Sequence, residues 1–225
     1  MKINNEAELL NMFCDKNIEQ EILHEPFYNT NFNEVWSSNR FILIRVNPKV
    51  LANEYTKKRL HSPVLECPCK KIITIEAINN ALNECPLVDE EIIIQDTIKC
   101  EECDGSGEVY WEYTDNHGHT HDCLYDCPIC DDTGEIEHKK TKKTGKQIIK
   151  ENSKINIGNA YFFAYNISKL KFAMDFLGIT SVELAFNPHK NANEFVIDED
   201  IRIEIMPIIF ENNLPCDAKV NLEDI

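Results

Sequence analysis

The alternation of apolar and polar residues along the chain predicts a mixed α+β fold with more strands than helices. Apolar residues recur at helical spacing in residues 6–17, 75–84 and 164–177. Short runs rich in β-branched and aromatic residues predict strands at 27–46, 91–95, 154–158, 181–186, 194–197 and 201–209. Thr74 and Gly178 are suitable caps for the second and third helices. The polar tail, 211–225, predicts no regular element.

The middle of the chain has a different pattern. Residues 108–113 and 120–125 predict the two strands of a hairpin whose turn is Asp115-Asn116-His117-Gly118. Further along, Thr144-Gly145 predicts a tight turn. We therefore expect a discontinuous α+β domain at 1–48 and 146–225, a connecting region with one helix at 49–94, and an inserted β-hairpin ribbon at 95–145.

Composition and charge narrow the class of protein. The chain has 225 residues, of which 43% are hydrophobic, and a formal net charge of −16. Such an acidic chain repels nucleic acid and anionic membranes unless its basic residues are segregated in one patch. No apolar run has the length of a transmembrane helix, so no membrane partner is expected. Ten cysteines without an apolar signal sequence predict a cytoplasmic, reducing location.

Four cysteines in two matched pairs carry the strongest chemical signal. The first segment is Cys100-Glu-Glu-Cys103-Asp-Gly-Ser-Gly, and the second is Cys127-Pro-Ile-Cys130-Asp-Asp-Thr-Gly. Two C-x-x-C pairs supply the four thiolates that a tetrahedral structural zinc ion requires. Glycines after each pair suit the sharp reversal of the chain there; they are Gly105, Gly107 and Gly134. We expect one structural Zn²⁺, held by these four cysteines.

The two segments resemble half of the cysteine-rich zinc region of DnaJ-type chaperones, whose repeat is C-x-x-C-x-G-x-G. The first segment fits the repeat fully, whereas Asp132 replaces the first glycine of the second. The family has four repeats and two zinc ions, so two repeats imply one ion. The resemblance covers 100 to about 137 and implies a zinc-ribbon fold. The chain has no His-Pro-Asp tripeptide, so the resemblance does not imply a co-chaperone.

The two ends of the chain resemble one domain of a bacterial DNA sliding clamp. The likeness is carried by 36–45, 162–170, 182–184 and 205–207 and covers roughly 1–48 and 150–210. It implies two αβββ halves around the insertion. Clamp rings line their hole with basic helices from six domains, so one domain per chain would require six subunits. The helix at 6–17 carries Glu6, Glu8 and Asp15, which favours a clamp-like fold without encirclement of DNA.

Two exposed features are candidates for partner binding, with either protein or nucleic acid as the partner. One is an aromatic group on the predicted hairpin: Tyr110, Trp111 and Tyr113. The other is a basic run: Lys139, Lys140, Lys142, Lys143 and Lys146. The aromatic side chains could stack on bases or grip a protein, or Trp111 could cover the small core beside the zinc. The lysines could contact phosphates or form a solvated loop.

The remaining polar residues suggest no catalytic constellation. A closed four-thiolate zinc has no open position for water, so we expect no enzyme. A cluster of His117, His119, His121 and Cys123 would be the alternative, as an open metal site of a metalloenzyme. Further thiols, Cys67, Cys69 and Cys85, either bind metal or are buried. Acidic pairs such as Asp89-Glu90 are interpreted as solubilising charge in turns.

The sequence thus predicts a non-enzymatic zinc-binding recognition or accessory module. A DNA sliding-clamp-like tethering protein, which would form ring oligomers, is the alternative function from another class.

Overall fold

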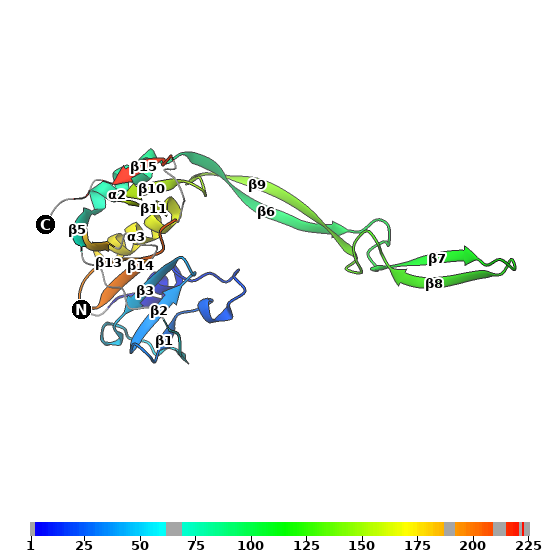
Figure 1. Cartoon of the computed structure of the whole chain (residues 1–225), viewed down its shortest axis with the longest axis horizontal. Coiled ribbons are helices and arrows are strands. Elements are labelled where there is room, and N and C mark those ends of the chain that lie inside the picture. Colours follow the sequence, from blue (N-terminus) through cyan, green and yellow to red (C-terminus); the bar gives the residue numbers. More distant parts are fainter. Residues whose placement is uncertain (1–2, 62–68, 187–191, 209–214, 221, 223–225) are drawn as a thin grey trace. The chain divides into compact units, whose positions relative to one another are not determined.

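The computed structural model describes residues 3–61, 69–186, 192–208, 215–220 and 222. The fold is mixed α+β and mostly sheet (Figure 1). Contacts divide the chain into two units, Met1–Leu87 with Ile149–Ile225, and Val88–Ile148. Within the described ranges, every helix is too short or too polar to cross a membrane.

An eight-stranded sheet forms the centre of the first unit. Its order is β4-β1-β2-β3-β14-β13-β12-β5. The strands are β1 (Phe27–Asn29), β2 (Glu34–Ser38), β3 (Ile42–Val46), β4 (Lys57–Lys58), β5 (Cys69–Thr74), β12 (Ser181–Phe186), β13 (Asn193–Val196) and β14 (Ile201–Ile205). The two chain ends meet where β3 pairs antiparallel with β14, with Val46 opposite Ile201. Alternating apolar residues of most of these strands face one buried core, whereas Phe27 and Trp36 form a second, smaller cluster with Leu23.

Three α-helices and a smaller sheet complete the first unit. The helices are α1 (Glu6–Asn11), α2 (Ile75–Glu84) and α3 (Ala164–Leu177), with short 3₁₀ turns η1 (Glu21–Leu23) and η2 (Pro48–Val50). Strands β10 (Lys154–Ile157), β11 (Ala160–Phe163) and β15 (Ala218–Val220) form a three-stranded sheet. Thr74 Oγ1 accepts a hydrogen bond from Ala77 N–H, and Gly178 ends α3 at φ 69°. Both predicted caps therefore act as expected.

Helix α1 is shorter than the helix predicted for 6–17. Leu10 and Phe13 are fully buried, as the helical spacing predicted. However, the Leu10 carbonyl accepts a hydrogen bond from the hydroxyl of Ser37 on β2. The same carbonyl accepts the Phe13 N–H, and the Asn11 carbonyl accepts the Cys14 N–H, so the α-helix ends in bonds of the shorter 3₁₀ type.

Buried charged side chains form ion pairs and hydrogen bonds between distant segments of the first unit. Arg45 lies between Glu34 and Glu204, with nitrogen–oxygen distances of 2.8 and 2.6 Å. Burial by itself lowers the pKa of Arg45, but the two carboxylates raise it overall. The side chain of Glu6 accepts hydrogen bonds from the backbone N–H groups of Ala52 and Asn53. Glu6 is therefore a buried structural group and does not present its charge to solvent.

The second unit consists of two two-stranded sheets. Strand β6 (Leu87–Lys99) pairs with β9 (Glu135–Ile149), and β7 (Glu108–Thr114) pairs with β8 (Thr120–Asp126). The β7–β8 hairpin lies where the sequence predicted one, with its turn closed by a Gly118 N–H bond to the Asp115 carbonyl.

The tight turn predicted at Thr144-Gly145 is wrong, because both residues lie inside β9. Acidic residues of β6 hold this part of β9 as a strand. Lys143 Nζ lies 2.6 Å from a carboxylate oxygen of Asp89, and Thr144 Oγ1 donates to Glu90 at 2.6 Å. The interpretation of Asp89-Glu90 as charge in a turn is wrong for the same reason. Cross-strand pairing outweighs the local turn preference here.

Candidate metal centre

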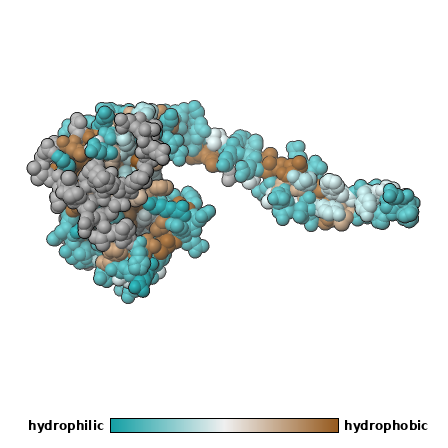
Figure 2. Space-filling view, in the orientation of Figure 1, coloured by the Kyte–Doolittle hydropathy of each residue, from teal (hydrophilic) through white to brown (hydrophobic). Residues whose placement is uncertain are grey.

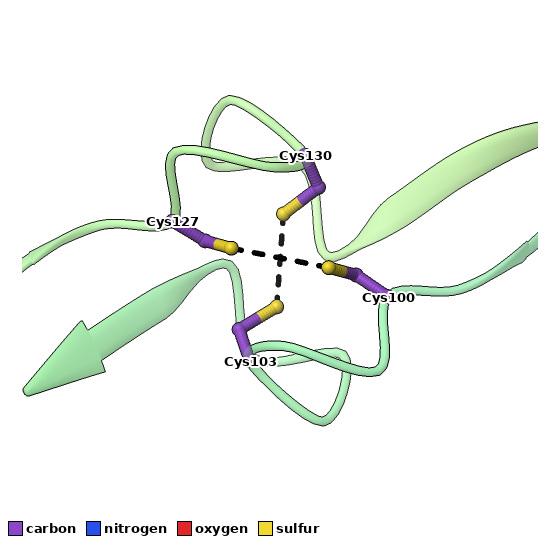
Figure 3. Close-up of side chains that lie close together, drawn as sticks. All are labelled: Cys100, Cys103, Cys127 and Cys130. Carbon is purple, nitrogen blue, oxygen red and sulfur yellow. Dashed lines mark hydrogen bonds between the residues drawn. The ribbon is translucent and has the colours of Figure 1, made fainter.

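Four cysteine sulfurs converge from two turns of the second unit. Cys100 directly follows β6 and Cys103 lies in the turn before β7, while Cys127 follows β8 and Cys130 lies in the turn before β9. All four side chains are buried, and their Sγ atoms lie within 4.8 Å of one another. Figure 3 shows the four sulfurs pointing toward one common centre. The chain thus forms a compact set of four thiols from segments 27 residues apart.

The spacing of the sulfurs fits a tetrahedral zinc ion. Cys100 Sγ lies 3.9 Å from Cys127 Sγ, and Cys103 Sγ lies 3.6 Å from Cys130 Sγ. Zinc–sulfur bonds of about 2.3 Å in a tetrahedron place the sulfurs roughly 3.8 Å apart. A disulfide would bring two sulfurs to about 2.05 Å. The observed spacing therefore suits a shared metal ion and not a pair of disulfides.

The backbone hydrogen bonds around the sulfurs are nearly the same in the two cysteine segments. The N–H of Gly107 donates to Cys103 Sγ at 3.3 Å, and the N–H of Gly134 donates to Cys130 Sγ at 3.3 Å. Each turn also bonds to the other one: Cys127 N–H donates to the Gly107 carbonyl at 2.7 Å, and Cys100 N–H donates to the Gly134 carbonyl at 2.8 Å. Backbone N–H groups of this kind stabilise the negative charge of thiolates.

Hydroxyl groups repeat in the same way. Ser106 Oγ donates to the Cys103 carbonyl at 2.7 Å, and Thr133 Oγ1 donates to the Cys130 carbonyl at 2.6 Å. The sequence analysis missed these two residues. Their signal was a hydroxyl at the same offset in both cysteine segments, since each stands three residues after the second cysteine.

The turn glycines are required by close approach of the two segments. A Cβ added to Gly107 would lie 2.0 Å from the Asp132 carbonyl oxygen, and one added to Gly134 would lie 2.5 Å from the Gly105 carbonyl oxygen. Asp132, which departs from the DnaJ-type repeat, has φ 69°, close to the 76° of Gly105. The aspartate adopts the left-handed conformation of the glycine that it replaces. The departure in sequence therefore leaves the turn unchanged.

Two thiols of the cluster have pKa values shifted in opposite directions. Burial raises the pKa of the Cys103 thiol, but the Gly107 N–H and the neighbouring cysteines outweigh it and lower the pKa to about 6. At Cys130 burial raises the pKa to about 12; the Gly134 N–H opposes this rise, and the other cysteines add to it. The first thiolate thus forms readily and the later ones are opposed. A divalent cation would remove that opposition.

Val109 and Ile136 pack against the four cysteines and form the small core of the site. The alternative in which Trp111 covers this core is therefore wrong, since its side chain is 58% exposed. Tyr110 and Tyr113 are also exposed on β7. Tyr125 of β8, which the sequence analysis missed, lies with its ring centroid 6.4 Å from that of Trp111.

The basic run lies on β9 and not on the aromatic hairpin. All five of its lysines are exposed: Lys139, Lys140, Lys142, Lys143 and Lys146. They belong to the β6–β9 sheet, whereas the aromatic residues belong to the β7–β8 sheet. Lys143 pairs with Asp89 on β6, and the hydroxyl of Thr141 donates to Glu91 at 2.8 Å. At least part of this run is thus matched to acidic residues of the neighbouring strand.

The histidines near the hairpin turn gather around a carboxylate. His119 Nδ1 and His121 Nε2 lie 3.4 and 3.2 Å from Asp115 Oδ2. These bonds and two backbone N–H bonds lower the pKa of Asp115. His117 lies with its ring 6.4 Å from that of His119. In the described part of the chain, the four buried cysteines form the one group of three or more ligands close enough to share a metal.

Of the other candidate thiols, the structure describes the side chain of Cys85. Cys67 lies outside the described residues, and Cys69 belongs to β5. Cys85 is buried, and its Sγ donates to the Ala81 carbonyl at 3.4 Å. Burial raises the pKa of Cys85 to about 11, so this thiol stays protonated at neutral pH.

No protein-family model and no curated protein matches this sequence. Among solved structures, the chain is similar to the DNA polymerase III β subunit of Borrelia burgdorferi, with 10% identity, a TM-score of 0.45, and coverage of 90% of this chain and 61% of that one. It is also similar to the DNA polymerase sliding clamp of Bacillus subtilis, with 9% identity, a TM-score of 0.44, and coverage of 93% and 62%. The C. crescentus β sliding clamp gives 7% identity, a TM-score of 0.42, and coverage of 92% and 64%.

The chain spans less than two thirds of the length of these structures. At such low identity and such TM-scores, the likeness does not by itself indicate a shared function. The four-cysteine cluster is thus the feature of the chain from which function can be argued.

Proposed function

We propose that this chain is a zinc-binding recognition module whose second unit is folded around one structural Zn²⁺ ion. The spacing of the four sulfurs, which matches a tetrahedral zinc–thiolate centre, carries the proposal. Cys100, Cys103, Cys127 and Cys130 would hold the ion. Gly107 and Gly134 would donate their N–H groups to two of the thiolates.

The role proposed for the ion is structural. Four thiolates fill the coordination shell of zinc and leave no position for a reacting water molecule. Among the described residues, the core around the cysteines contains Val109 and Ile136 as its further apolar contacts. Such a small apolar cluster contributes little burial energy, so the metal would supply much of the folding free energy of these turns.

The charges of the first unit favour recognition over encirclement of DNA. A clamp ring would require basic groups on helices that face phosphate. On α3, Lys169 is buried with its Nζ 4.8 Å from the centroid of the Tyr165 ring, and Lys171 pairs with Asp175 at 2.5 Å. On α1, Glu6 is buried and the other acidic residue, Glu8, is exposed. These two helices offer little positive charge to a nucleic acid.

Zinc stoichiometry tests the proposal directly. Reduced, untagged protein purified without chelator should contain one zinc ion per chain. Cys100→Ser should lose the ion, because a hydroxyl replaces one buried thiolate ligand. Cys123→Ser provides the matched control, since Cys123 is exposed on β8 and lies outside the cluster. Wild-type protein without zinc, or equal zinc contents in both variants, would refute the proposal.

A further inference from the structure

The β7–β8 hairpin has two chemically different faces. Antiparallel register places Trp111 opposite Cys123 and Tyr113 opposite His121, while Glu112 lies opposite Asp122. Because side chains alternate between faces along a strand, opposite residues share a face. We call one the aromatic face: Val109, Trp111, Tyr113, His121, Cys123 and Tyr125. We call the other the acidic face: Glu108, Tyr110, Glu112, Asp122, Leu124 and Asp126.

The rings of the aromatic face form two neighbouring pairs that are open to solvent. Tyr113 stacks on His121 with a centroid distance of 5.0 Å, and Trp111 meets Tyr125 edge-on at 6.4 Å. Tyr113, Trp111 and Tyr125 are 62, 58 and 56% exposed. A shallow hollow of about 430 Å³ lies among these three rings, with Glu112 and Asp126 also on its wall. Exposed ring faces on a hairpin rich in acidic residues form an environment for a cation.

The surroundings of the hairpin are uniformly negative. Twelve acidic residues and no lysine or arginine occur from Glu101 to Glu137. Zinc bound by four thiolates would add about two further negative charges. Figure 2 shows this end of the second unit as mostly hydrophilic to neutral, without a wide hydrophobic patch. Such a surface repels phosphate groups and attracts basic groups.

We propose that the aromatic face binds a basic peptide segment of a partner protein, with an arginine or lysine side chain held over the rings of Trp111, Tyr113 and Tyr125. The carboxylates of the acidic face, Glu112 and Asp126 among them, would attract neighbouring basic residues of the peptide. An arginine suits the site best, because its planar guanidinium stacks on aromatic rings. The inference rests on the proposed zinc module, since the cysteine turns bond to each other where β7 begins and β8 ends.

A peptide of repeated Arg-Gly pairs, labelled with fluorescein, is the probe that we would use. Binding is measured by fluorescence anisotropy on the whole zinc-loaded chain at physiological ionic strength, where diffuse attraction is largely screened. A Glu-Gly repeat peptide of equal length and a single-stranded oligothymidylate are the comparison ligands. The Arg-Gly peptide should bind, and the other two should not.

A matched pair of variants separates the aromatic face from general charge attraction. Trp111→Thr should weaken binding on the order of fivefold, the effect of losing one exposed cation–π contact. Tyr110→Thr removes a more exposed aromatic residue from the acidic face and should change binding less than about twofold. Threonine suits strands, so both variants keep the hairpin. Trp111→Phe, which keeps a ring, should bind between Trp111→Thr and the wild type.

Zinc is assayed in every sample, which separates the two proposals. One zinc per chain without binding of the Arg-Gly peptide refutes the cation site and leaves the zinc module standing. Equal losses in Trp111→Thr and Tyr110→Thr also refute it, because charge alone would then explain the attraction. Preferred binding of oligothymidylate overturns it in favour of nucleic acid. Absence of zinc from the wild type refutes the zinc module and the inference together.

Discussion

Replacing Gly107 by alanine isolates the role of the close approach between the two cysteine turns. Gly107 and Gly118 have the same φ of 82°, so alanine is equally strained in its backbone at both positions. They differ in their surroundings: a Cβ at Gly107 would lie 2.0 Å from the Asp132 carbonyl oxygen, whereas one at Gly118 would meet nothing within 4 Å. Gly118→Ala is therefore the control for Gly107→Ala.

The structure gives the expected difference in energetic cost between Gly107→Ala and Gly118→Ala. The left-handed conformation costs alanine about 1–2 kcal/mol at either position. At Gly107 the backbone must also move by about 1 Å, since a Cβ essentially never approaches another heavy atom more closely than 3.0 Å. That movement weakens the bonds of Gly107 to Cys127 N–H and to Cys103 Sγ. Each buried group left unpaired costs about 1–3 kcal/mol, so weakening both bonds gives an extra cost of roughly 2–6 kcal/mol.

Zinc affinity is the quantity to measure, by competition with a colorimetric chelator. If folding of the turns is coupled to metal binding, the extra cost lowers the zinc affinity of Gly107→Ala by about thirtyfold to twenty-thousandfold relative to that of Gly118→Ala. Circular dichroism in the presence of excess zinc shows whether the hairpin still forms. Affinities of the two variants within about fivefold of each other would refute the coupling between the turns.

Three further predictions concern acid and buried charge. Zinc affinity should fall more than about tenfold per unit of acidification, because the ion competes with protons for four thiolates; a pH-independent affinity would contradict this. Glu6→Gln should lower the free energy of unfolding at neutral pH by about 1–3 kcal/mol in urea titrations, since hydrogen bonds from Ala52 and Asn53 make the pKa of Glu6 lower than normal despite its burial. The stabilising contribution of ionised Glu6 is present above the pKa of the unfolded state and is lost as pH falls through the lower pKa of the folded state. The free energies of unfolding of the wild type and of Glu6→Gln should therefore converge in acid. Arg45→Met should lower the free energy of unfolding by about 3–5 kcal/mol, because Glu204 is left buried without its partner. Adding Glu204→Leu should restore part of that loss in the same urea titrations. A double variant no more stable than Arg45→Met would contradict the pairing.

Elements with strong local signals could be predicted closely from the sequence. Helices α2 and α3 begin and end at the predicted residues because Thr74 and Gly178 set their ends locally. The hairpin β7–β8 follows from two β-rich runs around a turn at Gly118. The convergence of the four cysteines could be predicted because two C-x-x-C pairs, each followed by glycine, are typical of a shared metal site.

The parts that were missed depend on partners distant in sequence. Strand β9 runs through Thr144-Gly145 because acidic residues of β6 bond to it, and no local pattern reveals that pairing. Strand β15 lies in the tail predicted to have no regular element, and it forms by parallel pairing with β10. The left-handed conformation of Asp132 likewise arises from its place in the cysteine turn, since its neighbours in sequence do not require it.

The reciprocal bonds between the cysteine turns have a consequence for assembly. Cys100 depends on the Gly134 carbonyl for its backbone partner, and Cys127 depends on the Gly107 carbonyl. Each loop therefore needs the other loop to complete its backbone hydrogen bonds. Folding of the two loops should accordingly be all-or-none, and chains with one loop ordered and the other disordered should be scarce when zinc is limiting.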